Sequence, residues 1–209
     1  SEDTPLHFVV FTHALPPGGA ERQWCYLANG LHEAGYKVTF VAEHHLEGYN
    51  AHYQTLLNGT NIEVVELAKI DMDTCLNTFA DDKALLDVFS APGNPFGECL
   101  PKLVTILRSL NPSVVIAQLD SINLLGGFAG ILAGCPQTIL SFRNYNPSSF
   151  EYLHNDWFLP AYRKLSRHQG IVFSGNSHAA NNDYAAWMGI KPNRITWIPN
   201  IVDKALQQP

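Results

Sequence analysis

The chain has 209 residues, a length that suits one large domain or two small ones. Hydrophobic residues make up 46% and charged residues 15% of the sequence, which excludes intrinsic disorder and indicates a well-buried globular protein. Thirteen Lys and Arg against 19 Asp and Glu give a net charge of −6, which argues against a nucleic-acid partner because such proteins are usually basic.

Short apolar runs alternate with segments of helical periodicity along the chain. The apolar runs predict strands at 6–12, 37–42, 62–67, 114–118, 137–142, 171–174 and 194–198. The periodic segments predict helices at 20–34, 53–57, 100–110, 122–133, 150–166 and 177–188. Pro160 is expected to kink or break the helix that contains it. The segment 68–97 follows neither pattern.

This alternation predicts an α/β fold with a doubly wound, mainly parallel, seven-stranded Rossmann-like sheet. Residues 1–198 would form the domain, and residues 199–209 would begin a linker. Ligands of such sheets bind at the carboxyl ends of the strands. The candidate site residues are therefore the polar ones that directly follow each strand.

Two glycines stand between the first strand and the first helix, in the string Pro16-Pro17-Gly18-Gly19-Ala20-Glu21-Arg22. Glycine lets another group approach the backbone closely, and the free N–H groups of a helix start suit a phosphate. A tight turn is the alternative role for Gly18 and Gly19, and a favourable interaction with the helix dipole is the alternative for Glu21. The string lacks the G-x-G-x-x-G pattern, so ordinary dinucleotide binding is not indicated.

Other polar residues follow the strands and are expected at the same edge. His13 has a side chain whose ordinary pKa of about 6.5 suits proton transfer, although an ordinary surface role is the alternative. The candidates after the later strands, expected to line a cleft, are Asp120, Ser121, Arg143, Asn144, Asn176 and Asn200.

Two sequence patterns resemble metal-binding motifs, but neither predicts a metal site. His44-His45 has no third ligand at a defined spacing. Asp71-Met72-Asp73 is a D-x-D pattern that arises readily by chance and lies outside the strand–helix alternation. The four cysteines show no C-x-x-C or zinc spacing, which indicates reduced thiols in a cytoplasmic protein.

The string PPGGAERQW after a first strand resembles the N-terminal half of GT-B fold glycosyltransferases of the retaining family-four group. Residues 174–203 resemble the stretch of that family that ends in a Pro-Asn-x-x-Asp linker, matched here by Asn200 and Asp203. Residues 103–117 resemble its helix, Asn-Pro turn and strand. The ordered set covers nearly the whole chain.

The resemblance implies the acceptor-binding domain of a metal-independent hexosyltransferase. The full enzyme would move a sugar from a nucleotide-diphospho-sugar, its donor substrate, to a hydroxyl of a sugar or lipid-linked acceptor in polysaccharide or glycolipid synthesis, without a further cofactor. Gly18 and Gly19 would face the donor phosphates and the acceptor. The C-terminal donor domain, with its Glu-x₇-Glu motif, would be missing from this chain, so we expect no turnover from the chain alone.

One position departs from the family pattern, because Arg143-Asn144 stands where many relatives have a histidine. An arginine can stabilise charge on the acceptor or the diphosphate through its fork of N–H donors. It cannot act as a general base, because it stays protonated. An ion pair with Asp120 or Glu151 is the alternative.

Residues 150–168 combine aromatic with basic side chains, as peripheral membrane contacts do. A helix that packs its aromatic side chains on the sheet is the alternative. Two rival functions also stay open, namely half of a nucleotide-sugar epimerase and a non-catalytic binding module of flavodoxin-like fold.

Overall fold

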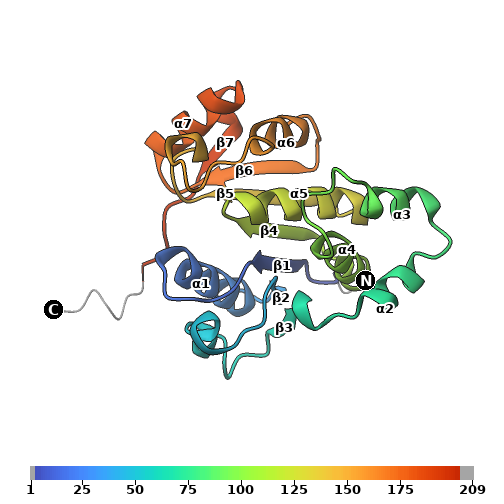
Figure 1. The fold of residues 1–209 in the computed structure, drawn as a ribbon. Helices are drawn as coiled ribbons and strands as arrows, with labels where there is room; N and C mark the ends of the chain where they lie inside the picture. The colour runs from blue at the N-terminus through green and yellow to red at the C-terminus, as the bar shows by residue number, and fades with distance from the viewer. Residues whose placement is uncertain (1–2, 203–209) are drawn as a thin grey trace.

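In a computed structural model that describes residues 3–202, the chain forms one sheet of seven parallel strands with helices packed on it (Figure 1). The strands lie in the order β3-β2-β1-β4-β5-β6-β7. Their bounds are β1 His7–Thr12, β2 Lys37–Ala42, β3 Glu63–Glu66, β4 Val114–Gln118, β5 Gln137–Phe142, β6 Ile171–Gly175 and β7 Ile195–Trp197. The predicted seven-stranded, doubly wound fold is confirmed.

Seven α-helices are found among the described residues. They are α1 Gly19–Glu33, α2 Met72–Thr78, α3 Lys83–Ser90, α4 Cys99–Leu110, α5 Asp120–Ala133, α6 Phe158–Leu165 and α7 His178–Met188. Helices α4 to α7 bury their apolar side chains against one face of the sheet, and α1 buries its own against the other face. Strand side chains alternate between the two clusters, as Val9 and Val10 do, because successive residues of a strand point to opposite faces.

Helix α5 lies unusually close to the sheet because it carries glycine on its inner side. A Cβ atom at Gly127 would come 2.7 Å from Leu165 Cδ1, and one at Gly130 would overlap the Thr138 hydroxyl. Real Cβ atoms are not found this close to another atom, so larger residues here would push the helix away from β5 and α6. This packing holds the start of α5 firmly beside the carboxyl end of β4.

The helix predicted at 150–166 is wrong in its first half. Only Phe158–Leu165 is helical, and residues 150–157 form turns. Pro160 therefore lies in the first turn of α6, where a backbone N–H has no helical partner to lose, so it causes no kink. The segment 53–57 forms a 3₁₀ turn, Gln54–Leu56, and the last strand is shorter than predicted.

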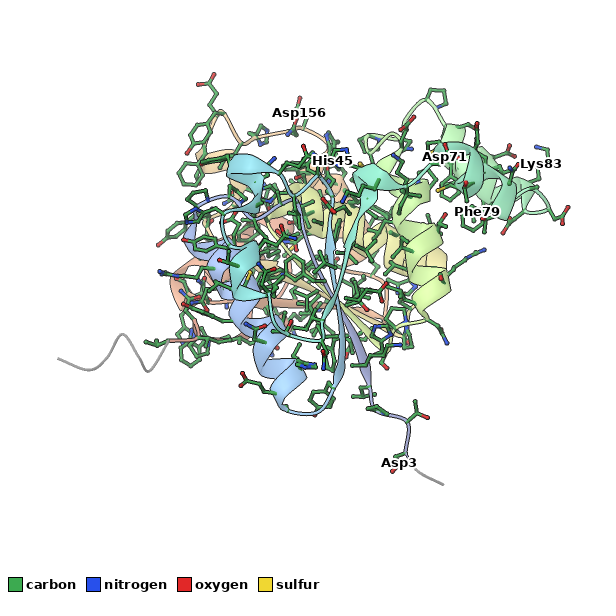
Figure 2. The ribbon with its side chains drawn as sticks, turned by 90° about the horizontal axis from the view of Figure 1, so that it is seen from below. Asp3, His45, Asp71, Phe79, Lys83 and Asp156 are labelled. Atoms are coloured by element: carbon green, nitrogen blue, oxygen red, sulfur yellow. The ribbon has the colours of Figure 1, made fainter. Side chains whose placement is uncertain are left out.

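The unassigned segment 68–97 forms α2 and α3, which extend to one side of the molecule (Figure 2). Asp71 and Asp82 each cap one of these helices by accepting a hydrogen bond from a backbone N–H. In Figure 2, His45 and Asp3 mark opposite ends of the sheet, since His45 follows β2 and Asp3 precedes β1. No helix among residues 3–202 combines the length and the apolar character that crossing a membrane requires.

Candidate functional site

A polar cavity of about 340 Å³ lies at the carboxyl ends of the strands. It is bordered by the start of α1, the residues after β4, β5 and β6, and the segment after β7. Its lining residues are Gly19, Ala20, Arg22, Gln23, Leu119, Arg143, Asn144, Asn176 and Asn200. The structure thus brings together six of the residues proposed from the sequence: Gly19, Arg22, Arg143, Asn144, Asn176 and Asn200.

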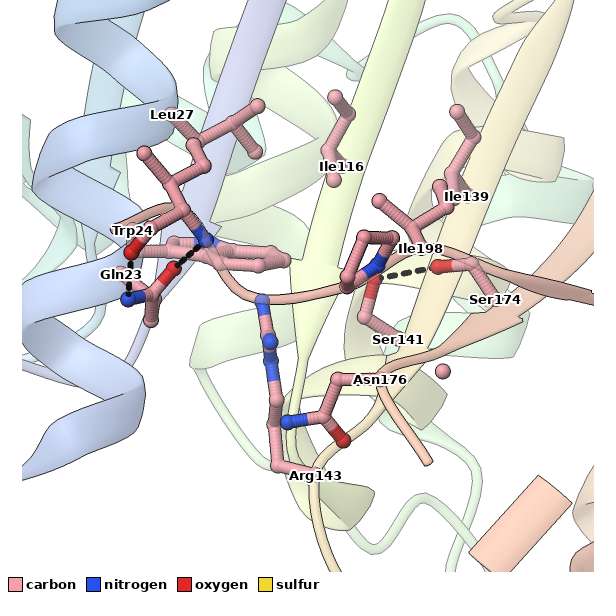
Figure 3. Close-up of a pocket in the computed structure, with 13 residues that line it drawn as sticks. Gln23, Trp24, Leu27, Ile116, Ile139, Ser141, Arg143, Ser174, Asn176 and Ile198 are labelled. Carbon is pink, nitrogen blue, oxygen red and sulfur yellow. Dashed lines mark hydrogen bonds between the residues drawn. The ribbon is translucent and has the colours of Figure 1, made fainter. Parts of the chain in front are cut away.

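Arg143 is the central side chain of this cavity. Its guanidinium carbon lies 4.8 Å from the centre of the Trp24 ring, which Figure 3 shows above it. Its Nη1 donates a hydrogen bond of 2.9 Å to Asn200 Oδ1, and its buried Nε has no partner among the described residues. Burial lowers the pKa of Arg143 to about 10, so the side chain stays charged at neutral pH.

The ion pair considered as the alternative for Arg143 does not form within residues 3–202. Asp120 Oδ1 instead accepts hydrogen bonds of 2.7 Å from the hydroxyls of Tyr162 and Tyr184. Glu151, the other carboxylate considered, forms no ion pair with it. Arg143 therefore faces the cavity as a cation whose contacts are an indole ring and a neutral amide.

A smaller cavity of about 100 Å³ lies on the other side of Arg143, between α1 and the sheet (Figure 3). Its walls are mainly apolar and include Leu27, Ile116 and Ile139. Three residues line both cavities, namely Gln23, Arg143 and Asn176. Ser141 and Ser174 share a hydrogen bond of 2.8 Å at its base. The guanidinium thus stands between a polar and an apolar space.

The segment after β7 closes both cavities. Asn200 Oδ1 accepts hydrogen bonds from Arg143 and, at 3.0 Å, from Asn176 Nδ2. The side-chain amide of Gln23 forms two hydrogen bonds with the backbone of Ile201, donating to its carbonyl at 2.7 Å and accepting from its N–H at 2.6 Å. Part of the predicted linker is therefore fixed to α1, while Asp203 and the rest of it lie outside the described residues.

Replacing Gln23 with alanine should release this segment. The variant loses two hydrogen bonds worth about 1 kcal/mol each, so we expect its free energy of unfolding to fall by about 2 kcal/mol. Urea unfolding measures this loss, and amide hydrogen exchange at Ile201 should become faster. The control is Gln137→Ala, which removes an exposed amide at the start of β5. Slow exchange at Ile201 in the Gln23 variant would show that the contact does not fix the segment.

In the glycine loop, glycine is sterically required at only one of the two positions. A Cβ atom at Gly18 would overlap the buried carboxylate of Glu21, whereas one at Gly19 would meet no atom within 4 Å. Glu21 Oε1 lies 3.7 Å from His13 Nε2. Burial lowers the pKa of His13 even though the Glu21 carboxylate acts in the opposite direction, so His13 is neutral at pH 7. These three residues border the start of α1 without lining the polar cavity.

Asp120 and Ser121, at the start of α5, also lie outside the lining of the cavity. The residue before them, Leu119, does line it and has φ +72° and ψ 151°, a conformation that is strained for any residue except glycine. Its carbonyl accepts a hydrogen bond of 2.7 Å from the Asn123 N–H, and its N–H donates to the Ser141 carbonyl at 3.3 Å. Strain held in place by its surroundings is frequent at functional sites.

The buried carboxylate of Asp120 predicts an unusual pH dependence. Burial raises the pKa of Asp120, although the two tyrosine hydroxyls act to lower it. Because the folded state holds the proton more tightly than the unfolded state, the Asp120 term favours folding below the ordinary Asp pKa of about 3.9. That stability is lost as the pH rises from there through the raised pKa.

The variant Asp120→Asn should remove this loss, since its amide oxygen can still accept from both tyrosines. We expect its free energy of unfolding, relative to the unmodified chain, to increase with pH across that window and then stay constant. Urea unfolding between about pH 4 and 8 tests this expectation. A relative stability that falls as the pH rises would contradict it.

The metal-like patterns have other contacts in the structure. Asp71 Oδ2 accepts hydrogen bonds from the N–H and hydroxyl of Thr74, both at 3.0 Å, as the cap of α2. His44 Nε2 lies 3.5 Å from Glu43 Oε1. Across residues 3–202, no three His, Cys, Asp or Glu side chains are grouped closely enough to hold a metal ion.

The aromatic segment 150–168 divides into two parts. Phe158 and Tyr162 are buried under α6 against the sheet, as the packing alternative expected. Tyr152 and Leu153, in the preceding turns, are 83% and 40% exposed.

Three residues of the site were not found from the sequence as site residues. They are Gln23, Trp24 and Leu119. The indole N–H of Trp24 also donates to the carbonyl of Phe11 at 2.9 Å. Gln23 and Trp24 end the PPGGAERQW string, but their contacts with Ile201 and Arg143 join distant segments that the string does not indicate. Leu119 is apolar, so it was not among the polar residues expected after the strands.

Comparison with known proteins decides the family. Residues 17–206 match the model of Glycosyltransferase Family 4. The chain belongs to this family. No curated protein matches it. The match agrees with the resemblance noted in the sequence and covers most of the chain.

Solved structures similar to this family-4 chain share its fold at low identity. The lipopolysaccharide outer core galactosyltransferase WaaB in its apo form is 11% identical, with a TM-score of 0.56, over 95% of this chain and 46% of that one. UDP-GlcNAc 2-epimerase from Methanocaldococcus jannaschii is 14% identical, with a TM-score of 0.51, over 94% and 45%. A putative UDP-N-acetylglucosamine 2-epimerase from Listeria monocytogenes is 11% identical, with a TM-score of 0.52, over 91% and 44%.

The chain therefore spans a little under half the length of these structures. Its sheet and flanking helices have the fold of one half of a GT-B structure.

Proposed function

We propose that this family-4 chain is the acceptor-binding half of a retaining, metal-independent glycosyltransferase. The full-length enzyme transfers a hexose from a nucleotide-diphospho-sugar to a hydroxyl of a sugar or lipid-linked acceptor in the cytoplasm. The observation that carries the proposal is the position of the polar cavity, at the carboxyl ends of the strands and bordered by the segment that leaves the domain. A second domain that follows this segment would stand beside the cavity.

The reaction joins an acceptor oxygen to the anomeric carbon of the sugar while the bond between that carbon and the diphosphate breaks. The diphosphate leaves with the electron pair, and the acceptor hydroxyl loses its proton. Stabilisation of the leaving charge by fixed donors is typically a large part of such catalysis. In this half, Arg143 would contribute to that role, and Gly19, where a Cβ atom would meet nothing within 4 Å, would leave the backbone at the start of α1 accessible.

His13 is the residue of this half best suited to the proton. It is neutral at pH 7 because burial lowers its pKa, and Glu21 lies beside it to stabilise the charged form once a proton arrives. Arg143 cannot take the proton, because it is already protonated. The remaining contacts to the donor would come from the second domain.

A second candidate function is half of a nucleotide-sugar epimerase. The specific observation in its favour is that two of the three solved structures described above bear the name UDP-GlcNAc 2-epimerase. Their identities of 14% and 11% support the fold alone, so the family match favours the transferase.

Product analysis of the full-length natural protein separates these functions. The protein is incubated with labelled UDP-, GDP- and ADP-sugars, with and without a mixture of sugar and lipid-linked acceptors. We expect free nucleoside diphosphate and a glycoside with the anomeric configuration of the donor, only when an acceptor is present. An altered nucleotide-linked sugar formed without an acceptor would instead identify an epimerase. An inverted glycoside would contradict the retaining reaction.

A further inference from the structure

Two arginines of the polar cavity have no acidic partner among residues 3–202. Arg22 is exposed at the start of α1, and Arg143 is half-buried after β5. The ion pairs of the described chain involve other cations, such as Lys69 with Glu66 and Lys102 with Glu98. Withdrawing a charge from water without a partner lowers stability, so the half-buried Arg143 needs another explanation, whereas the exposed Arg22 does not.

The surroundings of the two arginines are positive although the whole chain carries −6. The nine residues that line the cavity include two arginines and three asparagines but neither Asp nor Glu. The nearest carboxylates along the strand ends have other partners: Asp120 holds two tyrosines, Glu21 lies beside His13, and Asp183 accepts from Asn146. An anion that enters the cavity therefore meets two arginines and three asparagines, and no carboxylate among the lining residues.

The hydrogen-bond donors of the cavity are aimed at a common point. Arg143 Nη1 and Asn176 Nδ2 both donate to one oxygen, the Oδ1 atom of Asn200. The guanidinium carbon of Arg143 lies 4.8 Å from the centre of the Trp24 ring, and its buried Nε has no partner among the described residues, so an N–H group remains for a further acceptor. A guanidinium fork held in this way matches the two oxygens of a phosphate or carboxylate.

We infer that the acceptor bound by this half carries an oxyanion, a phosphate or a carboxylate, which Arg143 and Arg22 hold together with the cavity amides. This inference rests on the proposed function and names the chemical class of its acceptor. The lining residues named above all belong to this chain, so the inference can be tested on the chain directly. Arg143 here binds the acceptor in addition to facing the reacting groups.

Calorimetric titration of the 209-residue chain tests the inference with matched probes. The probes are glucose 1-phosphate, glucuronate, neutral methyl glucoside and UDP. We expect one or both sugar anions to bind, with an affinity that falls as salt increases, and the neutral glucoside to bind at least about tenfold more weakly. UDP should bind no more tightly than the sugar anions, because the proposed function assigns the nucleoside contacts to the second domain.

Substitutions locate the binding. Arg143→Gln should lower the affinity for the sugar anion by about tenfold or more. Arg143→Lys should restore only part of that affinity, because an ammonium keeps the charge but lacks the planar fork of N–H donors. Arg22→Gln changes an exposed side chain and leaves the core intact, so this variant tests the site even if the Arg143 variants are unstable. We expect it to lower the affinity for the sugar anion by about threefold. Arg167→Gln, an exposed arginine after α6, removes the same charge elsewhere and should change nothing.

Three results would overturn the inference. They are no binding of either sugar anion, equal binding of the neutral glucoside, and tight UDP binding that depends on Arg143, which would assign the site to the donor diphosphate. These results are independent of the transfer assay. Anion binding by this chain without transfer by the full-length protein would reject the proposed enzyme. Efficient transfer to neutral acceptors by the full-length protein, with no anion binding by this chain, would reject this inference alone.

Discussion

Replacing Arg143 with alanine should lower the transfer rate of the full-length natural enzyme by about 100-fold or more. Removal of one fixed donor to a developing negative charge commonly has an effect of this size. In this chain the lost group is a charged guanidinium that lies 4.8 Å from the centre of the Trp24 ring and donates to Asn200. Initial rates at saturating donor and acceptor measure the effect, and an unchanged kcat would remove Arg143 from the mechanism.

Two controls separate chemistry from folding in this experiment. Arg143→Lys keeps a positive charge without the planar fork, so we expect it to recover only part of the rate. Arg167→Ala removes an exposed arginine away from the cavity and should leave kcat unchanged. The unfolding midpoint of each variant should stay close to that of the unmodified protein, which shows that the variant is folded under the assay conditions.

The largest loss of stability is expected from Asn123→Ala. Asn123 is completely buried in α5, where its amide donates to the Ser141 carbonyl at 2.9 Å and accepts from the Ser141 N–H at 3.1 Å. It also donates to the hydroxyl of Tyr162 at 3.2 Å. Alanine leaves the Ser141 N–H without this partner inside the core, so the free energy of unfolding should fall by about 3 kcal/mol. Urea unfolding measures the change.

Asn58→Ala is the matched control, because it removes the same amide from an exposed turn and should change stability by less than about 0.5 kcal/mol. Since Ser141 lies two residues before Arg143, the Asn123 variant should also disturb the site. An Asn123 variant as stable as the Asn58 variant would show that the contact between α5 and β5 contributes little.

The fold was predictable because each strand is a short apolar run and each crossover helix has its own periodicity. The alternation alone requires parallel strands with helices between them, and the structure confirms all seven strands. Strand β4 is an example: its residues are buried on both faces, so Val114–Ala117 form a continuous apolar run that only Gln118 ends.

The errors arose where local sequence signals depend on tertiary contacts. Pro160 was expected to interrupt a long helix, but the helix begins only two residues before it. The sequence of 150–157 has the residues of a helix, yet this segment forms turns. The pattern alone could not indicate where the first turn of α6 would start.

The candidate site was predictable as an edge of the sheet and not as a set of contacts. Asn144, Asn176 and Asn200 were found because each follows a strand. The support of Arg143 by Trp24 and the fixation of Ile201 by Gln23 join segments more than 100 residues apart, and no spacing in the sequence marks such pairs. Asp120 follows a strand in the same way, but the two tyrosines that hold its carboxylate come from α6 and α7.

The most direct test of the account is a titration of nucleotide sugars against this chain and against the full-length natural protein. Isothermal calorimetry would use UDP, GDP, ADP and their sugars. If this chain is the acceptor-binding half, one of these donors binds the full-length protein and none binds the chain tightly. Tight binding of a nucleotide by the chain alone would contradict the account and would make it a self-contained nucleotide-binding protein.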